Sequence, residues 1–341
     1  MSTETHFTFG THDLNEKVMI VAEIGNNHEG DAGLAREMVI AAAEAGADAV
    51  KFQTIEAAKL VASDQTARIA QLGRFRLSNE IFEGLAETAS ANGAMFLSTP
   101  FHLDAVSWLG GIAPGFKIAS GDLTYNRLLE TVAAEGKPLL LSTGASTMDE
   151  VRAAKKTIED VWAANGTSPG LVLLHCTVSY PTAPQNANLS AIADLATLGT
   201  TVGFSDHTIG MEAAVLSVAL GARVIEKHFT LDKNQSDFRD HQLSADPADM
   251  KALVEAVRCA ETLIGSGGKR VLDCEAEVAP AVRRSVHASR DIAAGDVLGA
   301  DDTICLRPQG GVAPSGEAAL AGRRAKAAIA AGTSITDGLL D

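Results

Sequence analysis

The sequence predicts an α/β protein, a closed (β/α)8 barrel followed by a small second domain. Eight short apolar or β-branched segments alternate with Ala-rich segments of helical periodicity in the first 265 residues. Repeated strand–helix units indicate a parallel sheet, and eight of them indicate a barrel. An open doubly wound sheet is the competing fold. It usually carries a GxGxxG loop after its first strand, where this chain has EIGNN at residues 23–27.

The elements follow one another in a regular order. The first strand is predicted over residues 18–23 and the first helix over 32–45, with Gly46 as its stop signal. The later strands are predicted at 49–53, 95–99, 115–118, 138–142, 171–175, 201–204 and 223–228. The later helices are predicted at 79–92, 105–110, 126–135, 148–165, 189–198, 211–220 and 247–264, the last opening on Pro247, which suits a first helical position.

The pattern changes after residue 264. The GSGG segment at 265–268 ends the last helix and begins a linker. Beyond it come short strand signals at 285–289 and 303–307 and one helical stretch at 316–321. These features predict a barrel domain over 1–268, a linker over 269–283 and an α+β domain over 284–341. A domain of about 58 residues buries little surface by itself, so we expect it to dock on another surface.

Composition excludes several classes of protein. The chain has 43 acidic and 28 basic residues, a net charge of −15, which disfavours a nucleic-acid partner. No apolar run reaches the roughly 18 residues that a membrane span needs, and the first ten residues lack an apolar signal core. The four cysteines have no CxxC spacing, which disfavours disulfides and zinc. We expect a reduced, cytoplasmic protein.

Polar residues stand at the end of every predicted strand. In a (β/α)8 barrel these C-terminal ends form the mouth where active sites lie. The residues are Glu23, Lys51, Gln53, Ser98, Thr99, Lys117, Ser120, Ser142, Thr143, His175, Ser205, His207, Glu226 and His228. This concentration of lysine, serine and histidine at the ends of apolar strands predicts a functional site at the mouth.

Lys51 and Lys117 each lie between two apolar neighbours, so strand alternation points both side chains into the barrel. A buried lysine is costly without an anionic partner. One interpretation is a structural pair, for example Lys51 with Glu23. The sequence favours the other, a cradle for phosphate and carboxylate groups in which Ser120, Ser142 and Ser205 take part.

Two histidines follow neighbouring strands. His207 and His228 lie one strand–helix unit apart, which places two imidazoles side by side, with Asp206 one residue and Glu226 two residues before them in sequence. Two histidines with open positions suit a catalytic divalent metal. His175 lacks such a partner and is interpreted as structural. Asp240 and His241 could reach a polyhydroxylated ligand, and Tyr180 could form a wall of its site.

Nine motifs, in order along nearly the whole chain, resemble the sialic acid synthase family, which includes N-acetylneuraminate, legionaminate and pseudaminate synthases. They are AEIGNNHEG at 22–30, KFQ at 51–53, STPF at 98–101, KIASGD at 117–122, LSTG at 141–144, HCT at 175–177, YP at 180–181, GFSDHT at 203–208 and EKHF at 226–229. Residues 284–308 resemble the start of the family's antifreeze-like (SAF) domain.

The resemblance implies a transferase that condenses phosphoenolpyruvate with an N-acylated hexosamine, N-acetylmannosamine or a related 2,4-diacetamido sugar. Phosphate and a nine-carbon α-keto acid are released, with C–O cleavage of the enolpyruvate. It implies Mn²⁺ or Mg²⁺ held by His207 and His228. It also implies phosphoenolpyruvate bound by Lys51, Thr99, Lys117, Ser120, Ser142 and Ser205. The residues expected to carry the chemistry are Glu23, Lys51, Lys117 and Glu226.

For the sugar side the resemblance implies Gln53, Asp122, Tyr180 and Asp240. It also implies a domain-swapped homodimer in which Arg307 reaches the barrel of the partner subunit. Three departures from the family pattern fall on this side: Asp122 replaces a common Glu, Val178 a common Asn, and SDFRDH at 236–241 a common PGPDH. Arg239 would favour a charged sugar, or would form a surface salt bridge.

Three alternatives remain. A 3-deoxy-ulosonate synthase would also condense phosphoenolpyruvate, but with an aldose phosphate and without an SAF tail. A metal-dependent hydrolase would use both histidines to activate water, yet the His-x-His pair usual on its first strand is absent. A non-catalytic sugar-binding or ice-binding SAF protein would not need Glu23, Lys51 and Lys117.

Overall fold

Eight parallel strands form the main sheet of the protein, in the order β5-β4-β3-β10-β9-β8-β7-β6. β5 and β6, the two ends of this order, lie in contact with each other, so the sheet curves round into a barrel. The computed structural model describes residues 6–238 and 240–341. The strands are β3 (Met19–Gly25), β4 (Ala49–Thr54), β5 (Met95–Pro100), β6 (Phe116–Ile118), β7 (Leu139–Ser142), β8 (Leu171–Cys176), β9 (Thr201–Asp206) and β10 (Val224–His228).

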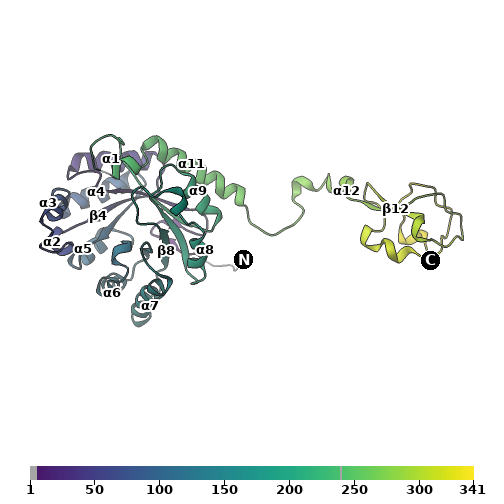
Figure 1. Ribbon diagram of the computed structural model, residues 1–341, viewed down its shortest axis with the longest axis horizontal. Coiled ribbons are helices and arrows are strands. Elements are labelled where there is room, and N and C mark those ends of the chain that lie inside the picture. The colour runs from purple at the N-terminus through teal and green to yellow at the C-terminus, as the bar shows by residue number, and fades with distance from the viewer. Residues whose placement is uncertain (1–5, 239) are drawn as a thin grey trace. The chain divides into compact units, whose positions relative to one another are not determined.

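One outer helix follows each strand and packs around the barrel (Figure 1). These helices are α1 (Ala32–Glu44), α4 (Asn79–Ala91), α5 (Asp104–Ile112), α6 (Asn126–Ala134), α7 (Met148–Ala164), α8 (Ala191–Ala196), α9 (Glu212–Ala219) and α11 (Pro247–Ile264). Side-chain caps begin several of them: Thr147 and Glu150 form a capping box on α7, and Asp246 caps α11. Gly46, with φ of 95°, follows the end of α1 as predicted.

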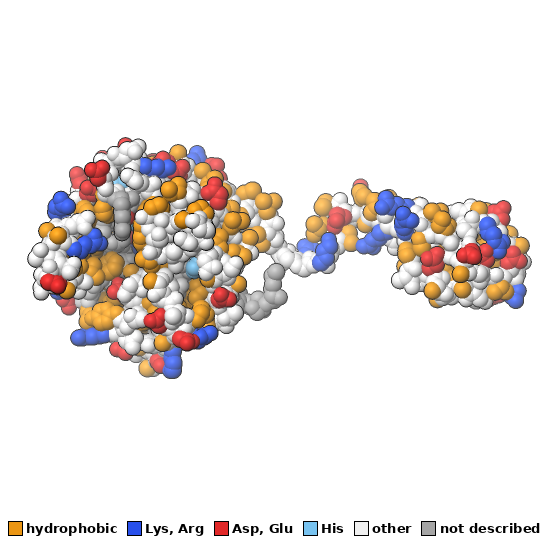
Figure 2. Space-filling view, viewed as in Figure 1, with side chains coloured by type: hydrophobic (Ala, Val, Ile, Leu, Met, Phe, Trp, Pro, Cys, Tyr) orange, Lys and Arg blue, Asp and Glu red, His pale blue; other side chains and the backbone are white. Residues whose placement is uncertain are grey.

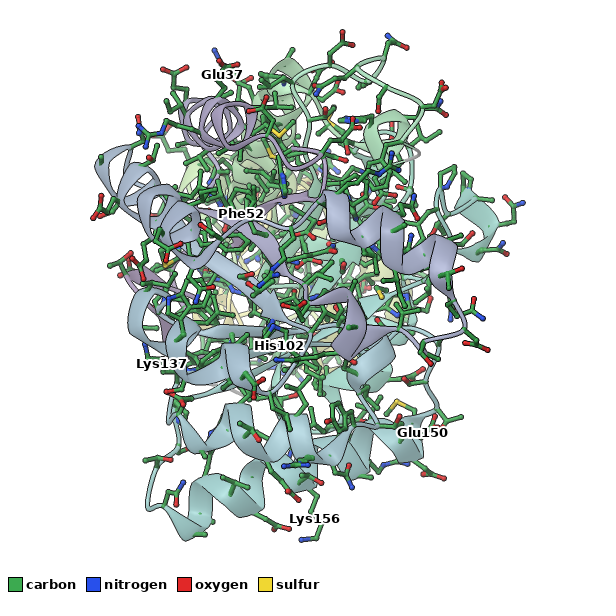
Figure 3. All side chains as sticks on the ribbon, turned by 90° about the vertical axis from the view of Figure 1, so that its left-hand side faces the viewer. Glu37, Phe52, His102, Lys137, Glu150 and Lys156 are labelled. Atoms are coloured by element: carbon green, nitrogen blue, oxygen red, sulfur yellow. The ribbon has the colours of Figure 1, made fainter. Side chains whose placement is uncertain are left out.

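Two apolar layers hold the barrel together. The larger one lies between strands and helices, where Phe52, Phe82 and Phe96 are buried against one another. Phe52 is labelled in Figure 3. The smaller one fills the end of the barrel at which the strands begin. There Phe9 and Leu14 are fully buried in one cluster with side chains such as Met19 and Val224. The two layers leave the opposite end of the barrel, where the strands finish, for polar groups.

The structure confirms the predicted barrel and shifts most element ends by one or two residues. It also adds elements that the sequence patterns do not predict. β1 (Thr8–Phe9) and β2 (His12–Asp13) form a hairpin that supplies Phe9, and α2 (Ala57–Leu60), α3 (Thr66–Arg74) and α10 (Asp240–Leu243) lie in loops after strands. Two-residue strands and single helical turns are too short to display a period. α3 is longer, but it lies in the segment between β4 and α4, for which no element is predicted.

The chain divides into two compact units, Met1–Gly265 and Ser266–Asp341. The second unit contains α12 (Ala279–Val282) and the antiparallel strands β11 (Ser285–Ala288) and β12 (Thr303–Leu306). Its own core includes Val286, Ile292 and Leu340. The helical stretch predicted at 316–321 is a 3-10 helix, Pro314–Leu320. The finer division at residues 268 and 283 stays a prediction.

The surface carries charged side chains of both signs, scattered over the visible face of the first unit (Figure 2). This agrees with a solvated acidic surface as the source of the net charge of −15. No helix in the described ranges is long and apolar enough to cross a bilayer.

Candidate active site

A cavity of about 860 Å³ opens where the barrel strands end. Its walls bring together nearly all the residues that the sequence singles out for the site. These are Glu23, Lys51, Gln53, Thr99, Lys117, Ser120, Ser142, Tyr180, Ser205, His207, Glu226, His228 and Asp240. Strand register sets them at one level, because His228 pairs with Glu23, Glu23 with Lys51, and Glu226 with Ser205.

Two lysines and two glutamates alternate on the floor of the cavity. Lys51 Nζ lies 2.6 Å from Glu23 Oε2 and 3.6 Å from Glu226 Oε2, and Lys117 Nζ lies 3.4 Å from Glu226 Oε1. All four side chains are almost wholly buried. With two positive and two negative charges the cluster is neutral when every group is ionised, so the ion pairs offset the cost of burying each charge.

The two glutamates differ in their electrostatic surroundings. Burial raises the pKa of Glu23 above its ordinary value, although Lys51 opposes the shift. Burial also acts to raise the pKa of Glu226, but Lys117, Lys51 and the Ser205 hydroxyl outweigh it and lower this pKa to about 2. Glu226 is therefore a fixed anion at neutral pH, whereas Glu23 is the carboxylate better suited to exchange a proton.

The lysines also differ. Burial lowers the pKa of Lys117, partly offset by Glu226. Burial acts in the same direction on Lys51, but Glu226 and Glu23 outweigh it, so the pKa of Lys51 is raised. Lys51 therefore stays charged while it bridges both carboxylates. Lys117 has one carboxylate within ion-pair distance among the described residues, which makes it the lysine more available to an incoming anion.

Several hydroxyl groups surround the lysines. Ser205 Oγ donates to Glu226 Oε1 over 2.8 Å, and Lys51 Nζ donates to Thr99 Oγ1 over 3.3 Å. Ser120 Oγ accepts from the Gly144 amide over 3.0 Å. Ser142 Oγ is buried and has no hydrogen-bond partner within the described chain. Since buried polar groups are normally satisfied, this hydroxyl is a free donor directed at a cavity that a ligand can enter.

His207 and His228 lie beside each other at the rim, with ring centroids 5.4 Å apart, and Tyr180 lies 4.2 Å from the His207 ring. Burial lowers the pKa of each histidine to about 4, so both rings are neutral at pH 7. His207 Nδ1 donates to the Thr177 carbonyl over 2.9 Å, which leaves Nε2 as an acceptor. His228 Nδ1 is buried and has no hydrogen-bond partner within the described chain.

These two rings fit a divalent cation. Neutral imidazoles are the form that binds metal, and the Thr177 contact is the kind of outer bond that orients a metal-ligating ring. No group of three or more His, Cys, Asp or Glu side chains in residues 6–238 and 240–341 is arranged to hold a metal. The two rings would thus supply part of a coordination sphere and leave positions for water and substrate, as in catalytic sites.

The outer wall of the cavity contains residues that the sequence analysis missed. Arg68, Gln71 and Arg74 of α3 line it, and Phe75 packs on Phe238 with ring centroids 5.1 Å apart. The sequence pattern that could have indicated them is their spacing of three residues, which places all three on one polar face of a short helix. Glu29, also on this wall, accepts hydrogen bonds from Ser236 and His241, which tie the loop after β10 to the loop after β3.

Three other residues that the sequence singles out, His175, Asp122 and Arg307, lie outside the described cavity lining or outside this unit. His175 is buried and bonds to the Ala187 carbonyl over 2.8 Å, which agrees with the structural interpretation. Asp122 ends a 3-10 turn and is not among the described residues that line the cavity. Arg307 belongs to the second unit. Arg239 lies outside the described residues. Roles for Asp122 and Arg307 stay predictions.

Asp122→Asn is expected to change stability in a pH-dependent way. Burial raises the pKa of the Asp122 carboxyl to about 6, and Lys117 only partly opposes the shift. The stability from this group is thus complete below about pH 4 and lost as pH rises through 6. At pH 7.5 the free energy of unfolding of the variant should exceed that of wild type by about 1 kcal/mol, a value below the full effect of the pKa shift because the carboxyl is partly exposed. At pH 4 the two proteins should be equally stable. Calorimetric unfolding at both pH values measures this, and an equal difference at both would contradict it.

Comparison with known proteins extends these observations. A model of the NeuB family matches residues 38–269, and a model of the SAF domain matches residues 283–341. An uncharacterised protein of Methanocaldococcus jannaschii is 44% identical over 299 residues, which cover 87% of each chain. The N,N'-diacetyllegionaminic acid synthase of Legionella pneumophila is 41% identical over 331 residues, covering 93% of this chain and 92% of that protein.

A solved structure is similar as well. The N-acetylneuraminic acid synthetase of Leptospira borgpetersenii superimposes with a TM-score of 0.73 at 33% identity, covering 77% of this chain and 90% of that one. These matches confirm the predicted fold class, a (β/α)8 barrel with a C-terminal SAF domain.

Proposed function

We propose that this chain condenses phosphoenolpyruvate with an N-acylated hexosamine. The premise is that the chain belongs to the NeuB family and is therefore an enzyme. The products are inorganic phosphate and a nine-carbon α-keto acid. The observation that carries the proposal is the buried floor of the cavity, where Lys51 and Lys117 alternate with Glu23 and Glu226 beside several hydroxyls. Such a floor suits a small, highly charged ligand better than a neutral one.

The phosphoenolpyruvate subsite consists of Lys51, Thr99, Lys117, Ser120, Ser142 and Ser205. The phosphate and carboxylate of this substrate would pair with the two ammonium groups, of which Lys117 has the fewer carboxylate contacts. The unpartnered Ser142 hydroxyl would donate to the same ligand. Glu226, held as an anion, keeps both lysines charged and in place between turnovers.

Gly144→Ala tests this subsite. A Cβ on Gly144 would lie 2.6 Å from Cys176 Sγ, 2.7 Å from Val178 Cγ2 and 2.9 Å from Ser120 Oγ, so the side chains around Ser120 must shift. We expect kcat/KM for phosphoenolpyruvate to fall roughly 10- to 100-fold, since small displacements of a positioning group cost this much. Gly111→Ala is the matched control, because a Cβ there meets nothing within 4 Å. Steady-state kinetics measures both, and equal kcat/KM values would remove Ser120 from the subsite.

The acceptor would lie above this floor, toward the outer wall. Gln53, Tyr180 and Asp240 line that part of the cavity, and Asp122 is close in sequence to the lining residue Gly121. N-acetylmannosamine and a 2,4-diacetamido sugar are the two candidate classes. The second gains support from the Legionella relative, whose named product carries two N-acetyl groups. The partner's Arg307 would contact the acyl group in a domain-swapped homodimer.

His207 and His228 would hold a divalent cation, Mn²⁺ or Mg²⁺, at the rim. The chemistry that this cation supplies when bound is Lewis-acid polarisation of the acceptor aldehyde. Tyr180 packs against both imidazoles, with ring centroids 4.2 Å from His207 and 6.0 Å from His228, and so shields them from bulk water.

The reaction balances with the groups at hand. The π electrons of the C2–C3 double bond of phosphoenolpyruvate form the new C–C bond from C3 to C1 of the open-chain sugar, and the aldehyde oxygen takes up a proton from solvent. Water then adds at C2 and gives its proton to Glu23, the carboxylate with the raised pKa. Lys51 and Lys117 stabilise the charges of the resulting tetrahedral intermediate. The C2–O bond to phosphate then breaks, and the proton of the new C2 hydroxyl leaves with the phosphate, so the C2 ketone remains. Glu23 returns to solvent the proton that it took from water.

An acceptor panel tests the proposal. Purified enzyme with phosphoenolpyruvate and Mn²⁺ should release phosphate only when an N-acylated hexosamine is present, and the product should have the mass of the condensed acid. N-acetylmannosamine, a 2,4-diacetamido sugar and an aldose phosphate are the arms. Turnover with the aldose phosphate alone would support the ulosonate synthase alternative, and no turnover with any sugar would refute the proposal.

A further inference from the structure

A second buried lysine–carboxylate pair lies outside the cavity. Lys227 Nζ is 2.8 Å from Asp206 Oδ2, and the exposed fractions of these residues are 2% and 0%. Neither residue lines the cavity, since strand alternation turns Lys227 away from the side to which its neighbours Glu226 and His228 point. Burying both charges is costly unless the geometry is good, and hydrophobic replacements are often as stable. Stability alone is therefore a weak reason for this pair.

The pair brackets His207. Asp206 Oδ1 accepts from the Thr208 amide over 2.8 Å, and Lys227 Nζ donates to the Thr208 carbonyl over 2.5 Å. His207 is the residue between them. Its carbonyl accepts from the Thr182 amide over 2.8 Å, and its ring bonds to Thr177. The backbone on both sides of this imidazole is thus held by the buried ion pair.

The pair also spans the two strands that carry the histidines. Lys227 of β10 is the cross-strand partner of Asp206 of β9. Each of the two residues immediately precedes one histidine, so the ion pair joins the backbone of His207 to that of His228. Loosening it would change the relative placement of two rings whose centroids are 5.4 Å apart. Within the described chain, neither Asp206 nor Lys227 makes an ion pair or hydrogen bond to either of the two lysines on the cavity floor.

We propose that Asp206 and Lys227 are positioning residues that set the spacing of the two imidazoles and so determine how tightly the enzyme holds its divalent cation. This inference rests on the proposed function, in which His207 and His228 bind that cation. Contacts that orient metal ligands typically change metal affinity by about 10- to 100-fold when removed.

The test is Mn²⁺ binding to the full-length protein without substrate, measured by electron paramagnetic resonance of free Mn²⁺. The double variant Asp206→Asn, Lys227→Met removes both charges together and leaves no unpaired ion. We expect its dissociation constant for Mn²⁺ to rise about 10-fold or more. Phosphoenolpyruvate affinity without metal should stay within about threefold of wild type, because a general loosening of the barrel would weaken both ligands.

The matched control removes a different buried cross-strand contact. Thr54 and Ser98 hydroxyls bond over 2.8 Å between β4 and β5 at the same end of the barrel, and neither residue lines the cavity. Thr54→Val with Ser98→Ala should bind Mn²⁺ as wild type does. If the double variant fails to fold, Lys227→Arg replaces it in the Mn²⁺ binding test. It keeps the charge with another shape and should weaken Mn²⁺ binding about threefold or more.

Two results separate failure of the inference from failure of its premise. A folded double variant, or Lys227→Arg, that binds Mn²⁺ as tightly as wild type would overturn the positioning role. If the His207→Ala and His228→Ala variants bind Mn²⁺ as tightly as wild type, the metal site itself is overturned, and the inference with it.

Discussion

Lys117→Met is expected to lower kcat/KM for phosphoenolpyruvate by on the order of 10³-fold. The side chain is almost wholly buried and faces one carboxylate, Glu226, at 3.4 Å. Methionine keeps the length of the side chain but removes a charge that the substrate needs. It also removes the group that does most to lower the pKa of Glu226, so the remaining carboxylate loses part of its stabilisation.

Steady-state kinetics with varied phosphoenolpyruvate measures this effect. Lys156→Met on α7 is the control, because that exposed lysine pairs with Asp160 on the surface and such pairs contribute little. Lys117→Arg should recover part of the activity, since it restores the charge with a different shape. Activity of Lys117→Met within tenfold of wild type would show that the cradle does not depend on this lysine.

Glu23→Gln is expected to lower kcat by about 10²- to 10⁴-fold while KM for phosphoenolpyruvate changes only a few-fold. Glu23 is the buried carboxylate with the raised pKa, placed 2.6 Å from Lys51 and bonded to Gln53 over 3.0 Å. An amide oxygen can still accept from Lys51, so the cradle is retained. The amide cannot take a proton from water, so the second half of the reaction slows.

Glu226→Gln gives the contrasting pattern and serves as comparison. Glu226 is a fixed anion with a pKa of about 2, so its amide changes the charge beside Lys51 and Lys117 and acts mainly on KM. Rapid-quench experiments that separate C–C bond formation from phosphate release distinguish the two variants. A Glu23→Gln enzyme with more than half of the wild-type kcat would remove Glu23 as the base.

Much of the barrel could be predicted because its helices and strands are long enough to display a period. α11 is the clearest case: Pro247 at its start and Gly265 after its end gave the bounds Pro247–Ile264 that the structure has. The hairpin β1–β2 could not be predicted, since Phe7, Phe9 and Leu14 are too few apolar residues in a polar stretch to display a period. Phe9 and Leu14 are buried only because the barrel provides a cluster for them.

The site divides in the same way. Alternation along β4 and β6 was enough to place Lys51 and Lys117 inside the barrel, and adjacent strands were enough to pair His207 with His228. Sequence left the ion pair and the anion cradle as two interpretations of the lysines. The structure shows the ion pairs to Glu23 and Glu226, and the cradle stays a proposal. Such contacts depend on side-chain distances across four strands, β3, β4, β6 and β10.

The outer wall was the hardest part to foresee. Arg68 and Arg74 reach the cavity from α3, a helix inserted between β4 and α4. Asp122 is the opposite case, a residue that the motif places at the site but that is not in the described lining of the cavity. One residue separates it from Ser120, which lines the cavity, yet the 3-10 turn over Ser120–Asp122 takes it out of the described lining. A single turn decides which side chains meet the ligand, and a motif match does not resolve that.

The central claim is that the lysine floor holds phosphoenolpyruvate for attack by its C3 and for C–O cleavage. Phosphoenolpyruvate labelled with ¹⁸O in the bridging position tests it directly, in a reaction with Mn²⁺ and the best acceptor from the panel. The account predicts that the released phosphate keeps the label and that a nine-carbon α-keto acid forms in equal amount. Unlabelled phosphate accompanied by pyruvate would mean hydrolysis at phosphorus and would contradict it.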